Sequence, residues 1–149
     1  MTDPGGPGQP GKERDFRLPI RIYWEDTDAA GVVFYANYLK FFERARTEWL
    51  RGHGLAQERM RAETGVAFVV SETSLRYLLP ARLDDLIEVD VHVERLGQAS
   101  LVVSQHAWRA DRLLAEGTIR IGCVDLGTFR PRRIPDTILS QLSGNDPPR

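Results

Sequence analysis

Two acidic residues, Asp26 and Asp28, are placed where they could support catalysis. They lie on either side of Thr27 in the segment EDTDAAGVVFYANYLKFFERAR, and an aromatic-rich run that turns helical follows them. An ionised aspartate near a helix N-terminus lies close to free backbone N–H groups and to the positive end of the helix dipole. Such a carboxylate can attack a carbonyl or activate water, while the N–H groups stabilise the oxyanion that develops. This arrangement suits acyl transfer to water.

The same residues also have a purely structural interpretation. Acids in turns before helices commonly cap the helix or remain solvated charges. Asp26 can orient the turn by accepting hydrogen bonds from backbone N–H groups. Gly31, three residues after Asp28, would let the backbone turn tightly or let a substrate approach it closely. The residues alone therefore leave the catalytic and the structural interpretation open.

One amphipathic helix is predicted directly after this turn. Its apolar residues recur at helical spacing, and the stripe contains Tyr38, Leu39, Phe42, Ala45, Trp49 and Leu50. Asn37 is the predicted N-cap, and Gly52 and Gly54 are the predicted stops. On the same helix Glu43 and Arg46 are spaced i,i+3, which predicts an ordinary ion pair. A role for these two in a dimer interface or active site is the alternative.

The rest of the chain reads mainly as strands. Apolar or alternating runs predict strands over residues 18–24, 67–75, 86–94, 101–109 and 113–124, with a short helix over 135–142. In the run 86–94, Val89, Val91 and Val93 alternate with Glu88, Asp90, His92 and Glu94. This period of two predicts one buried face and one face in water.

The order of these elements predicts an α+β fold. The apolar stripe of a single helix has to be buried by the inner face of the sheet. A curved antiparallel sheet wrapped around one long central helix is the hot-dog arrangement. The sheet would have unpaired edges, so association into a homodimer or homotetramer is expected. We expect a flexible Gly/Pro-rich arm over 1–16, one domain over 17–142 and a flexible tail over 143–149.

Composition excludes several classes of function. The chain has 149 residues, a net charge of -1 and one cysteine, Cys123, so neither nucleic-acid binding nor an intramolecular disulfide is expected. No apolar run is long enough to span a bilayer, and no apolar leader is evident, which predicts a cytoplasmic protein. The histidines, His53, His92 and His106, show no metal-ligand spacing, so neither a metal nor another cofactor is expected.

One long motif resembles a known family. The segment EDTDAAGVVFYANYLKFFERARTEWL is similar to the signature of hot-dog acyl-CoA thioesterases of the 4-hydroxybenzoyl-CoA type, and within them to the YbgC-like subfamily. The segments YLLPARLDDLIEV at 77–89 and RLGQASLVVSQ at 95–105 fit the same family. The resemblance covers roughly residues 17–140. It implies hydrolysis of the thioester of a small acyl-CoA to free acid and CoA.

The resemblance also assigns roles to residues. Asp28 is the family's catalytic carboxylate, as nucleophile or general base, and the backbone N–H of Tyr35 polarises the thioester carbonyl. The supporting residues are Asp26, Gly31, Asn37 and Glu43. Arginines suit phosphate recognition, so contacts to CoA, or to an acyl carrier protein as the alternative donor, are expected from Arg95, Arg130, Arg132 and Arg133.

Two other functions stay open. The first is a hot-dog protein that binds acyl-CoA or an acyl carrier protein without turnover, although pure binding would not require the Asp28 carboxylate. The second is a dehydratase acting on hydroxyacyl thioesters. That chemistry calls for a histidine paired with an acid, and the opening motif contains no histidine.

Overall fold

The computed structural model describes residues 16–143. Its elements, in chain order, are β1 Arg17–Arg21, the 3-10 turn η2 Trp24–Asp26, α1 Asn37–Gly52, α2 Gln57–Thr64, β2 Val66–Tyr77, β3 Leu86–Asp90, β4 His92–Leu96, β5 Ser100–Arg109, β6 Arg112–Asp125 and α3 Asp136–Leu142. Apart from Phe16 and Ser143, the predicted arm and tail lie outside the described residues. No helix within 16–143 has the length and apolar character needed to cross a membrane.

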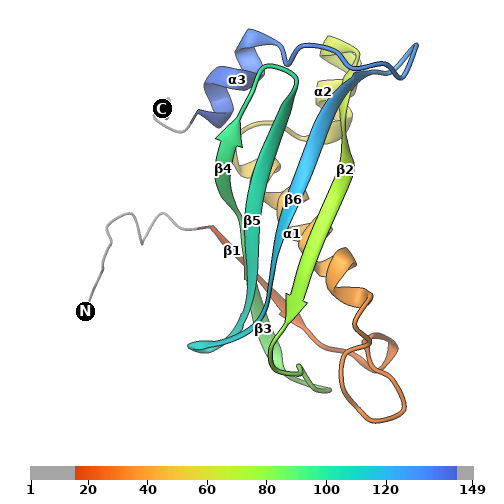
Figure 1. Cartoon of the computed structure of the whole chain (residues 1–149), viewed down its shortest axis with the longest axis vertical. Helices are drawn as coiled ribbons and strands as arrows, with labels where there is room; N and C mark the ends of the chain where they lie inside the picture. The colour runs from red at the N-terminus through yellow and green to blue at the C-terminus, as the bar shows by residue number, and fades with distance from the viewer. Residues whose placement is uncertain (1–15, 144–149) are drawn as a thin grey trace, which may run out of the picture.

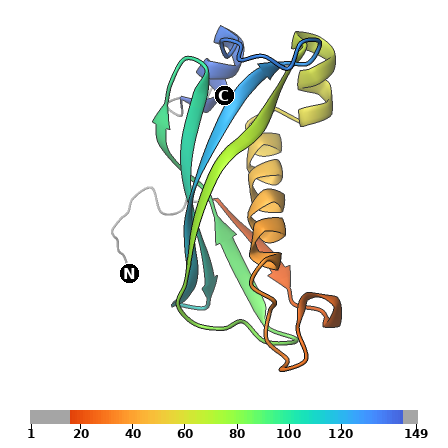
Figure 2. The same ribbon diagram turned by 45° about the vertical axis from the view of Figure 1, so that its right-hand side comes forward.

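The strands form one antiparallel sheet in the order β1-β3-β5-β6-β2, and β4 also pairs with β5. The longest strands, β5, β6 and β2, are consecutive in this order and pair over most of their length. Figures 1 and 2 show the sheet bending across α1, which runs along one of its faces. One sheet curved around one long helix is the α+β arrangement that the sequence predicts.

The core lies between α1 and the concave face of the sheet. The buried side chains of α1 are Tyr38, Phe41, Phe42, Ala45, Trp49 and Leu50. The predicted stripe was wrong at Leu39, which is 47% exposed, and it omitted Phe41, which is fully buried. Leu39 therefore lies outside the side of α1 that packs on the sheet. Each large apolar side chain removed from water contributes about 1.5–3 kcal/mol, so this face fixes the helix on the sheet.

Several predicted boundaries differ from the structure. The N-cap of α1 is Ala36, without a side-chain hydrogen bond, and Asn37 is the first helical residue. The helix ends at Gly52, and Gly54 adopts a positive φ of 79° two residues later. The first strand ends at Arg21, and of the residues predicted beyond it only Trp24 lies in another element, the 3-10 turn η2.

The predicted strand over 86–94 is interrupted at Val91, which separates β3 from β4. The prediction of a wet face on this strand was wrong for Asp90, which is only 2% exposed. Side chains from the neighbouring strand β5 cover this carboxylate. The prediction of a buried face was also wrong for Val93, which lies beyond the interruption and is 37% exposed.

Candidate active site

The acidic turn is a short closed loop between β1 and α1. An antiparallel bridge joins Thr27 to Val33 across the loop, and a second bridge joins Val32 to Arg82. Gly31 has φ +79°, and its N–H donates to the carbonyl of Asp28 at 2.9 Å. An added Cβ at Gly31 would meet no atom within 4 Å, so its backbone conformation, and not a lack of space, favours glycine there.

Asp26 is buried beneath the turn, and all its polar contacts are internal. A carboxylate oxygen accepts the N–H of Tyr23 at 2.8 Å. The backbone carbonyl of Asp26 accepts the N–H of Phe34 at 3.0 Å and the side-chain amide of Asn37 at 2.8 Å. The side chain of Asn37 therefore ties the first turn of α1 to the acidic turn, although it does not cap the helix.

Asp28 is exposed at the tip of the same loop. One carboxylate oxygen, Oδ1, accepts the N–H of Ala30 at 2.9 Å and the more distant N–H of Val32 at 3.5 Å. Within residues 16–143 the other oxygen, Oδ2, has no hydrogen-bond partner. One half of the carboxylate thus shapes the turn, and the other half is available to a substrate or a water molecule.

The backbone at Tyr35 leads into α1 with its N–H unused. Phe34 donates to Asp26, and Asn37 donates to the carbonyl of Phe34 at 2.8 Å, but the N–H of Tyr35 has no acceptor in the described part of the chain. The carbonyl of Tyr35 accepts the hydroxyl of Tyr77 on β2 at 3.2 Å. This contact anchors the residue through its carbonyl, in the peptide group that follows Tyr35, while the N–H of Tyr35 stays free to bind an oxyanion.

An aromatic hollow of about 280 Å³ adjoins this backbone. The rings of Tyr35 and Tyr77 meet edge to face with centroids 6.0 Å apart, and Tyr38 lies 5.5 Å from Tyr77. The remaining lining residues are Val33, Leu78, Leu79 and Pro80. Apolar walls beside a free N–H are suited to an acyl group whose carbonyl points at that N–H.

Glu43 and Arg46 do not form the predicted ion pair. Glu43 accepts the hydroxyl of Thr47 at 2.7 Å, whereas Arg46 donates to the side chain of Gln105 on β5 at 2.9 Å. Burial lowers the pKa of Arg46, and the neighbouring charge of Glu43 opposes that shift. Arg46 turns towards the sheet and Glu43 away from it, so their sequence spacing did not predict their partners.

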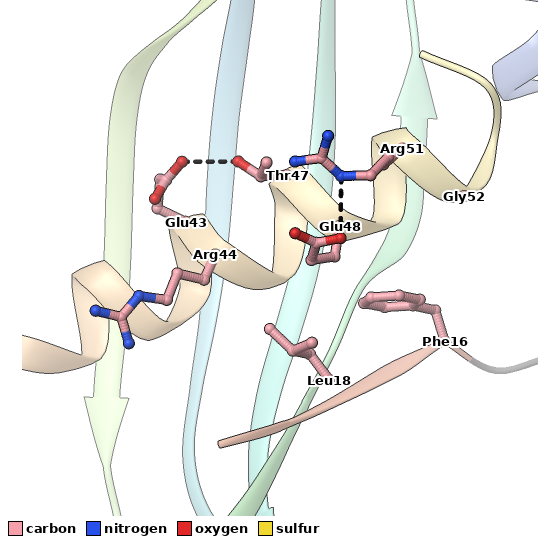
Figure 3. Close-up of a pocket in the computed structure, with 8 residues that line it drawn as sticks. All are labelled: Phe16, Leu18, Glu43, Arg44, Thr47, Glu48, Arg51 and Gly52. Carbon is pink, nitrogen blue, oxygen red and sulfur yellow. Dashed lines mark hydrogen bonds and ion pairs between the residues drawn. The ribbon is translucent and has the colours of Figure 1, made fainter. Parts of the chain in front are cut away.

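Glu43 lines two hollows beside α1. A groove of about 620 Å³ lies between the outer side of the helix and the start of β1, where Phe16 and Leu18 face the helix (Figure 3). A smaller hollow of about 140 Å³ lies between α1 and β2 and includes Phe68 and Val70. The larger groove contains no residue of the acidic turn, so its size does not make it the catalytic site.

The predicted CoA-binding arginines lie far along the fold from the acidic turn. Arg132 pairs with Asp125 at 3.3 Å and Arg133 with Asp136 at 3.9 Å, in the loop between β6 and α3. In Figure 1 this loop is at one end of β2 and the acidic turn is at the other. Arg95 and Arg130 form no ion pair with the described residues. A single chain therefore does not bring the arginines and Asp28 together.

A polar cluster that sequence analysis missed lies around Asp90. Its carboxylate accepts Nδ1–H and the backbone N–H of His106 at 3.0 and 2.6 Å, and the indole N–H of Trp108 at 3.1 Å. His92 Nε2 lies 3.3 Å from the other side of the same carboxylate. Burial would raise the pKa of Asp90, but these hydrogen bonds outweigh it and hold the pKa well below its usual range. The only signal in the sequence was the i,i+2 spacing of Asp90 and His92.

Comparison with known proteins gives a consistent result. Residues 22–142 match the family model of the thioesterase-like superfamily. The chain is 44% identical over 128 residues to the acyl-CoA thioester hydrolase YbgC of Escherichia coli, a match that covers 85% of this chain and 95% of the relative. It is 40% identical over 126 residues to the acyl-CoA thioesterase YbgC of Haemophilus influenzae, covering 85% and 93%. The crystal structure of a probable thioesterase from Bartonella henselae superposes with a TM-score of 0.78 at 30% identity, covering 81% and 99%.

Proposed function

The chain belongs to the thioesterase-like superfamily and is a thioester hydrolase of acyl-CoA, and we propose that Asp28 and the backbone N–H of Tyr35 carry out its chemistry. Membership confirms the hot-dog fold and the family resemblance expected from the motif at 25–50. The observation that carries the residue assignment is that a free carboxylate oxygen and a free N–H flank one short loop.

The reaction converts a thioester and water to a carboxylic acid and a free thiol. In one route Asp28 removes a proton from water, and the resulting hydroxide attacks the thioester carbonyl. In the other route the carboxylate attacks directly, and water then hydrolyses the mixed anhydride. Both routes break the C–S bond and release the thiolate of CoA, which takes up a proton. The N–H of Tyr35 stabilises the carbonyl oxygen while it carries negative charge.

Asp26, Asn37 and Gly31 serve as positioning residues in this proposal. Asp26 and Asn37 join the loop to the first turn of α1, and Gly31 supplies the left-handed backbone that closes the loop. A catalytic group has to be held within a fraction of an ångström of its productive position. The buried Asp26 and the bridges across the loop provide that rigidity for the exposed Asp28.

We further propose that the working unit is a dimer formed through β2. In residues 16–143, β2 pairs only with β6, so its second edge is unpaired, and it presents exposed Val70 and Tyr77. When two copies of a strand pair antiparallel about a two-fold axis, the start of one lies beside the end of the other. The acidic turn, at the end of β2, would then lie beside the partner's β2 start.

This pairing would also explain where the arginines are. Arg132 approaches Gly65 at the start of β2, and Arg130 and Arg133 are its neighbours in the chain. In the dimer these cations would lie next to the other subunit's acidic turn, where they could bind CoA phosphates. Glu43 and the hollow at Phe68 and Val70 would lie beside the same dimer interface, where the two β2 strands pair. An acyl carrier protein bearing phosphopantetheine is the alternative donor to this site.

We propose that the enzyme is cytoplasmic. Its one cysteine, Cys123, is buried and unpaired. A protein without disulfides fits the reducing environment of the cytoplasm, and we place the enzyme there.

The replacement of Asp28 by asparagine tests the catalytic assignment. Asparagine retains an Oδ1 that can accept the N–H of Ala30, so Asp28→Asn should preserve the turn while removing the charge and the basicity. Release of free thiol from a panel of acyl-CoA substrates should fall by about 10²–10⁴-fold in kcat, the usual contribution of a positioned base. Glu25→Gln, an exposed neighbour, is the matched control and should retain wild-type turnover.

Equal rates for wild type and Asp28→Asn would refute the assignment of this carboxylate. If the wild type released no thiol from any acyl-CoA or carrier-bound donor but bound them saturably, the non-catalytic binding protein would be the better description. Light scattering on purified protein tests the dimer separately. A monomer at micromolar concentration would contradict the shared site.

A further inference from the structure

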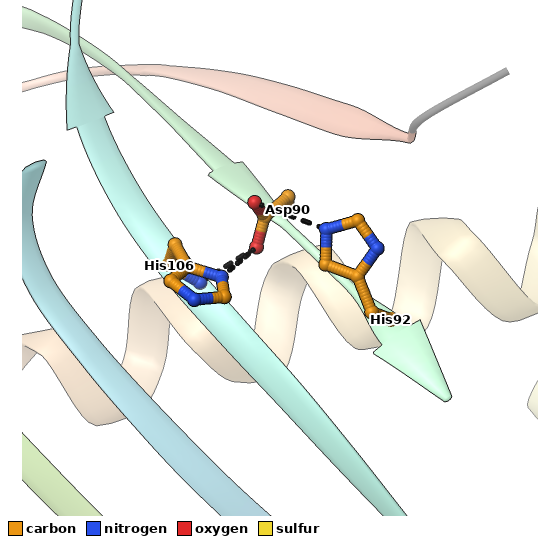
Figure 4. A group of neighbouring side chains, drawn as sticks. All are labelled: Asp90, His92 and His106. Atoms are coloured by element: carbon orange, nitrogen blue, oxygen red, sulfur yellow. Dashed lines mark hydrogen bonds and ion pairs between the residues drawn. The ribbon is translucent and has the colours of Figure 1, made fainter. Parts of the chain in front are cut away.

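The carboxylate of Asp90 and the imidazoles of His92 and His106 form a compact donor set on the sheet. Asp90 and His92 lie two residues apart across the break between β3 and β4, and His106 comes from the adjoining strand β5. Their candidate ligand atoms all lie within 4.8 Å of one another. Figure 4 shows Asp90 between the two imidazole rings. We propose that these three residues bind a divalent transition-metal ion of the Zn²⁺ type.

The spacing of the donors matches the coordination sphere of such an ion. Zinc binds imidazole nitrogen and carboxylate oxygen at about 2.0–2.2 Å, so two ligand atoms on a tetrahedral ion are about 3.3 Å apart. The nitrogen–oxygen separations here are 3.0 Å for His106 and 3.3 Å for His92. The ion would replace the proton that each imidazole now shares with the carboxylate. His106 contacts Oδ1 and His92 contacts Oδ2, and the donor atoms spread over as much as 4.8 Å, so the imidazoles would rotate towards each other to bind one ion.

The carboxylate keeps other hydrogen bonds when the histidines bind the ion. Oδ1 accepts the backbone N–H of His106, and Oδ2 accepts the indole N–H of Trp108. Trp108 is itself held by Arg17, whose guanidinium lies 5.1 Å from the indole centroid. Donors of this kind orient a ligating carboxylate and are a regular part of metal sites. The buried Asp90 is thus already oriented as an ionised ligand.

The donor chemistry selects the class of ion. Two imidazoles and one carboxylate suit Zn²⁺, Co²⁺, Ni²⁺ or Cu²⁺, whereas Mg²⁺ and Ca²⁺ prefer oxygen ligands throughout. Three protein ligands leave a fourth position for water. The His92 and His106 side chains are 38% and 27% exposed, so solvent can reach that position. His106 also lines an open hollow of about 240 Å³ beside Ser104 and Glu116.

The site lies on the opposite face of the sheet from the helix. Gln105 and Ala107 on β5 are buried towards α1, and Gln105 reaches the carbonyl of Phe42. Because side chains alternate along a strand, His106 points the other way. The proposed metal site is therefore separate from the thioester site at Asp28, and its occupancy does not depend on the proposed catalysis. A bound ion would join β3 and β4 to β5 at the point where Val91 interrupts the strand.

Zinc binding to the untagged full chain tests this proposal. Protein stripped with a chelator should bind one Zn²⁺ per chain in calorimetric titration, and Co²⁺ should give the visible absorption of a tetrahedral complex. The double variant His92→Gln/His106→Gln should weaken binding at least 100-fold. His53→Gln is the matched control, since His53 is the chain's remaining histidine and lies at the end of α1 against Trp49; it should bind as the wild type does.

A second variant separates a ligand effect from loss of fold. Trp108→Phe removes the indole N–H but keeps an aromatic ring, and it should weaken Zn²⁺ binding about 10-fold, in the range for groups that orient a metal ligand. Circular dichroism should show that each variant is folded; if the double variant is not, His92→Gln alone replaces it, because His92 is partly exposed. Zn²⁺ binding by wild type that is no tighter than binding by the histidine variant would overturn the proposal.

Discussion

Gln105 offers a sharp test of how the helix is held on the sheet. Its side chain is fully buried on β5 and links two layers of the fold. Oε1 accepts Nη1–H of Arg46 at 2.9 Å, and Nε2 donates to the carbonyls of Phe42 at 3.1 Å and Asp90 at 3.3 Å. We expect Gln105→Met, which keeps the length of the side chain but removes its polar atoms, to destabilise the protein substantially.

The magnitude follows from the three hydrogen bonds. The bond from a charged guanidinium contributes about 1.5–3 kcal/mol, and each neutral bond about 0.5–1.5 kcal/mol. The longest of the three lies at the low end of that range, and methionine recovers part of the loss through apolar packing. We therefore expect the free energy of unfolding to fall by about 3 kcal/mol. For a chain of this size that is a Tm lower by about 6–12 °C.

Urea unfolding of four proteins measures the central interaction directly. Wild type, Arg46→Met, Gln105→Met and the double variant form a cycle, and its coupling energy should be about 1.5–3 kcal/mol. Gln98→Met, at an exposed glutamine in the turn before β5, is the control and should change stability by less than about 0.5 kcal/mol. A coupling energy below about 0.5 kcal/mol would refute the argument that Arg46 and Gln105 stabilise the fold as a pair.

Three further perturbations test other parts of the structure. Gly117→Ala should lower the free energy of unfolding by about 1–3 kcal/mol in a urea melt, because the new Cβ would clash with the Leu75 side chain and lie 2.9 Å from the backbone oxygen of Ser74; unchanged stability would contradict this packing. Asn37→Ala should lower kcat for thiol release about 10-fold with a loss of only about 1 kcal/mol in stability, because the tie to Asp26 is one hydrogen bond; an unchanged kcat would remove Asn37 from the positioning residues. Burial raises the pKa of Tyr38 above 10.0 in the folded state, so the stability that its protonated form contributes is complete below pH 10 and is lost as the pH rises through the folded-state pKa. As the pH rises above 10, the free energy of unfolding of wild type should therefore fall relative to that of Tyr38→Phe. If the two proteins lost stability equally with pH, the raised pKa of Tyr38 would be refuted.

Local patterns in the sequence predicted most of the fold. The helical spacing of Tyr38, Phe42, Ala45 and Trp49 located α1 to within a residue, and apolar or alternating runs located the strands, although the run 86–94 is divided into β3 and β4. The break at Val91 was not predictable, because the residues on both sides of it keep the same alternation. The exposure of Leu39 depended on how α1 is rotated against the sheet, which no local pattern contains.

The candidate site was predictable only where its residues are neighbours in the chain. The acidic turn is one short segment, so Asp26, Asp28 and Tyr35 lie close together in the structure because they are close in the chain. Arg46 and Gln105, by contrast, are 59 positions apart, and His106 meets Asp90 only through the pairing of strands. Tertiary contacts of this kind follow from strand order, which the sequence alone did not specify.

The arginines and the acidic turn lie at opposite ends of β2, and this separation has a genetic consequence. If two chains pair along β2, each complete site draws one half from each copy. A chain damaged at Asp28 and a chain damaged at the arginines would then complement each other, since a mixed dimer keeps one intact site. Random mixing makes half of the dimers mixed, and one site in two is whole in each of them, so two inactive alleles together would restore about a quarter of the activity.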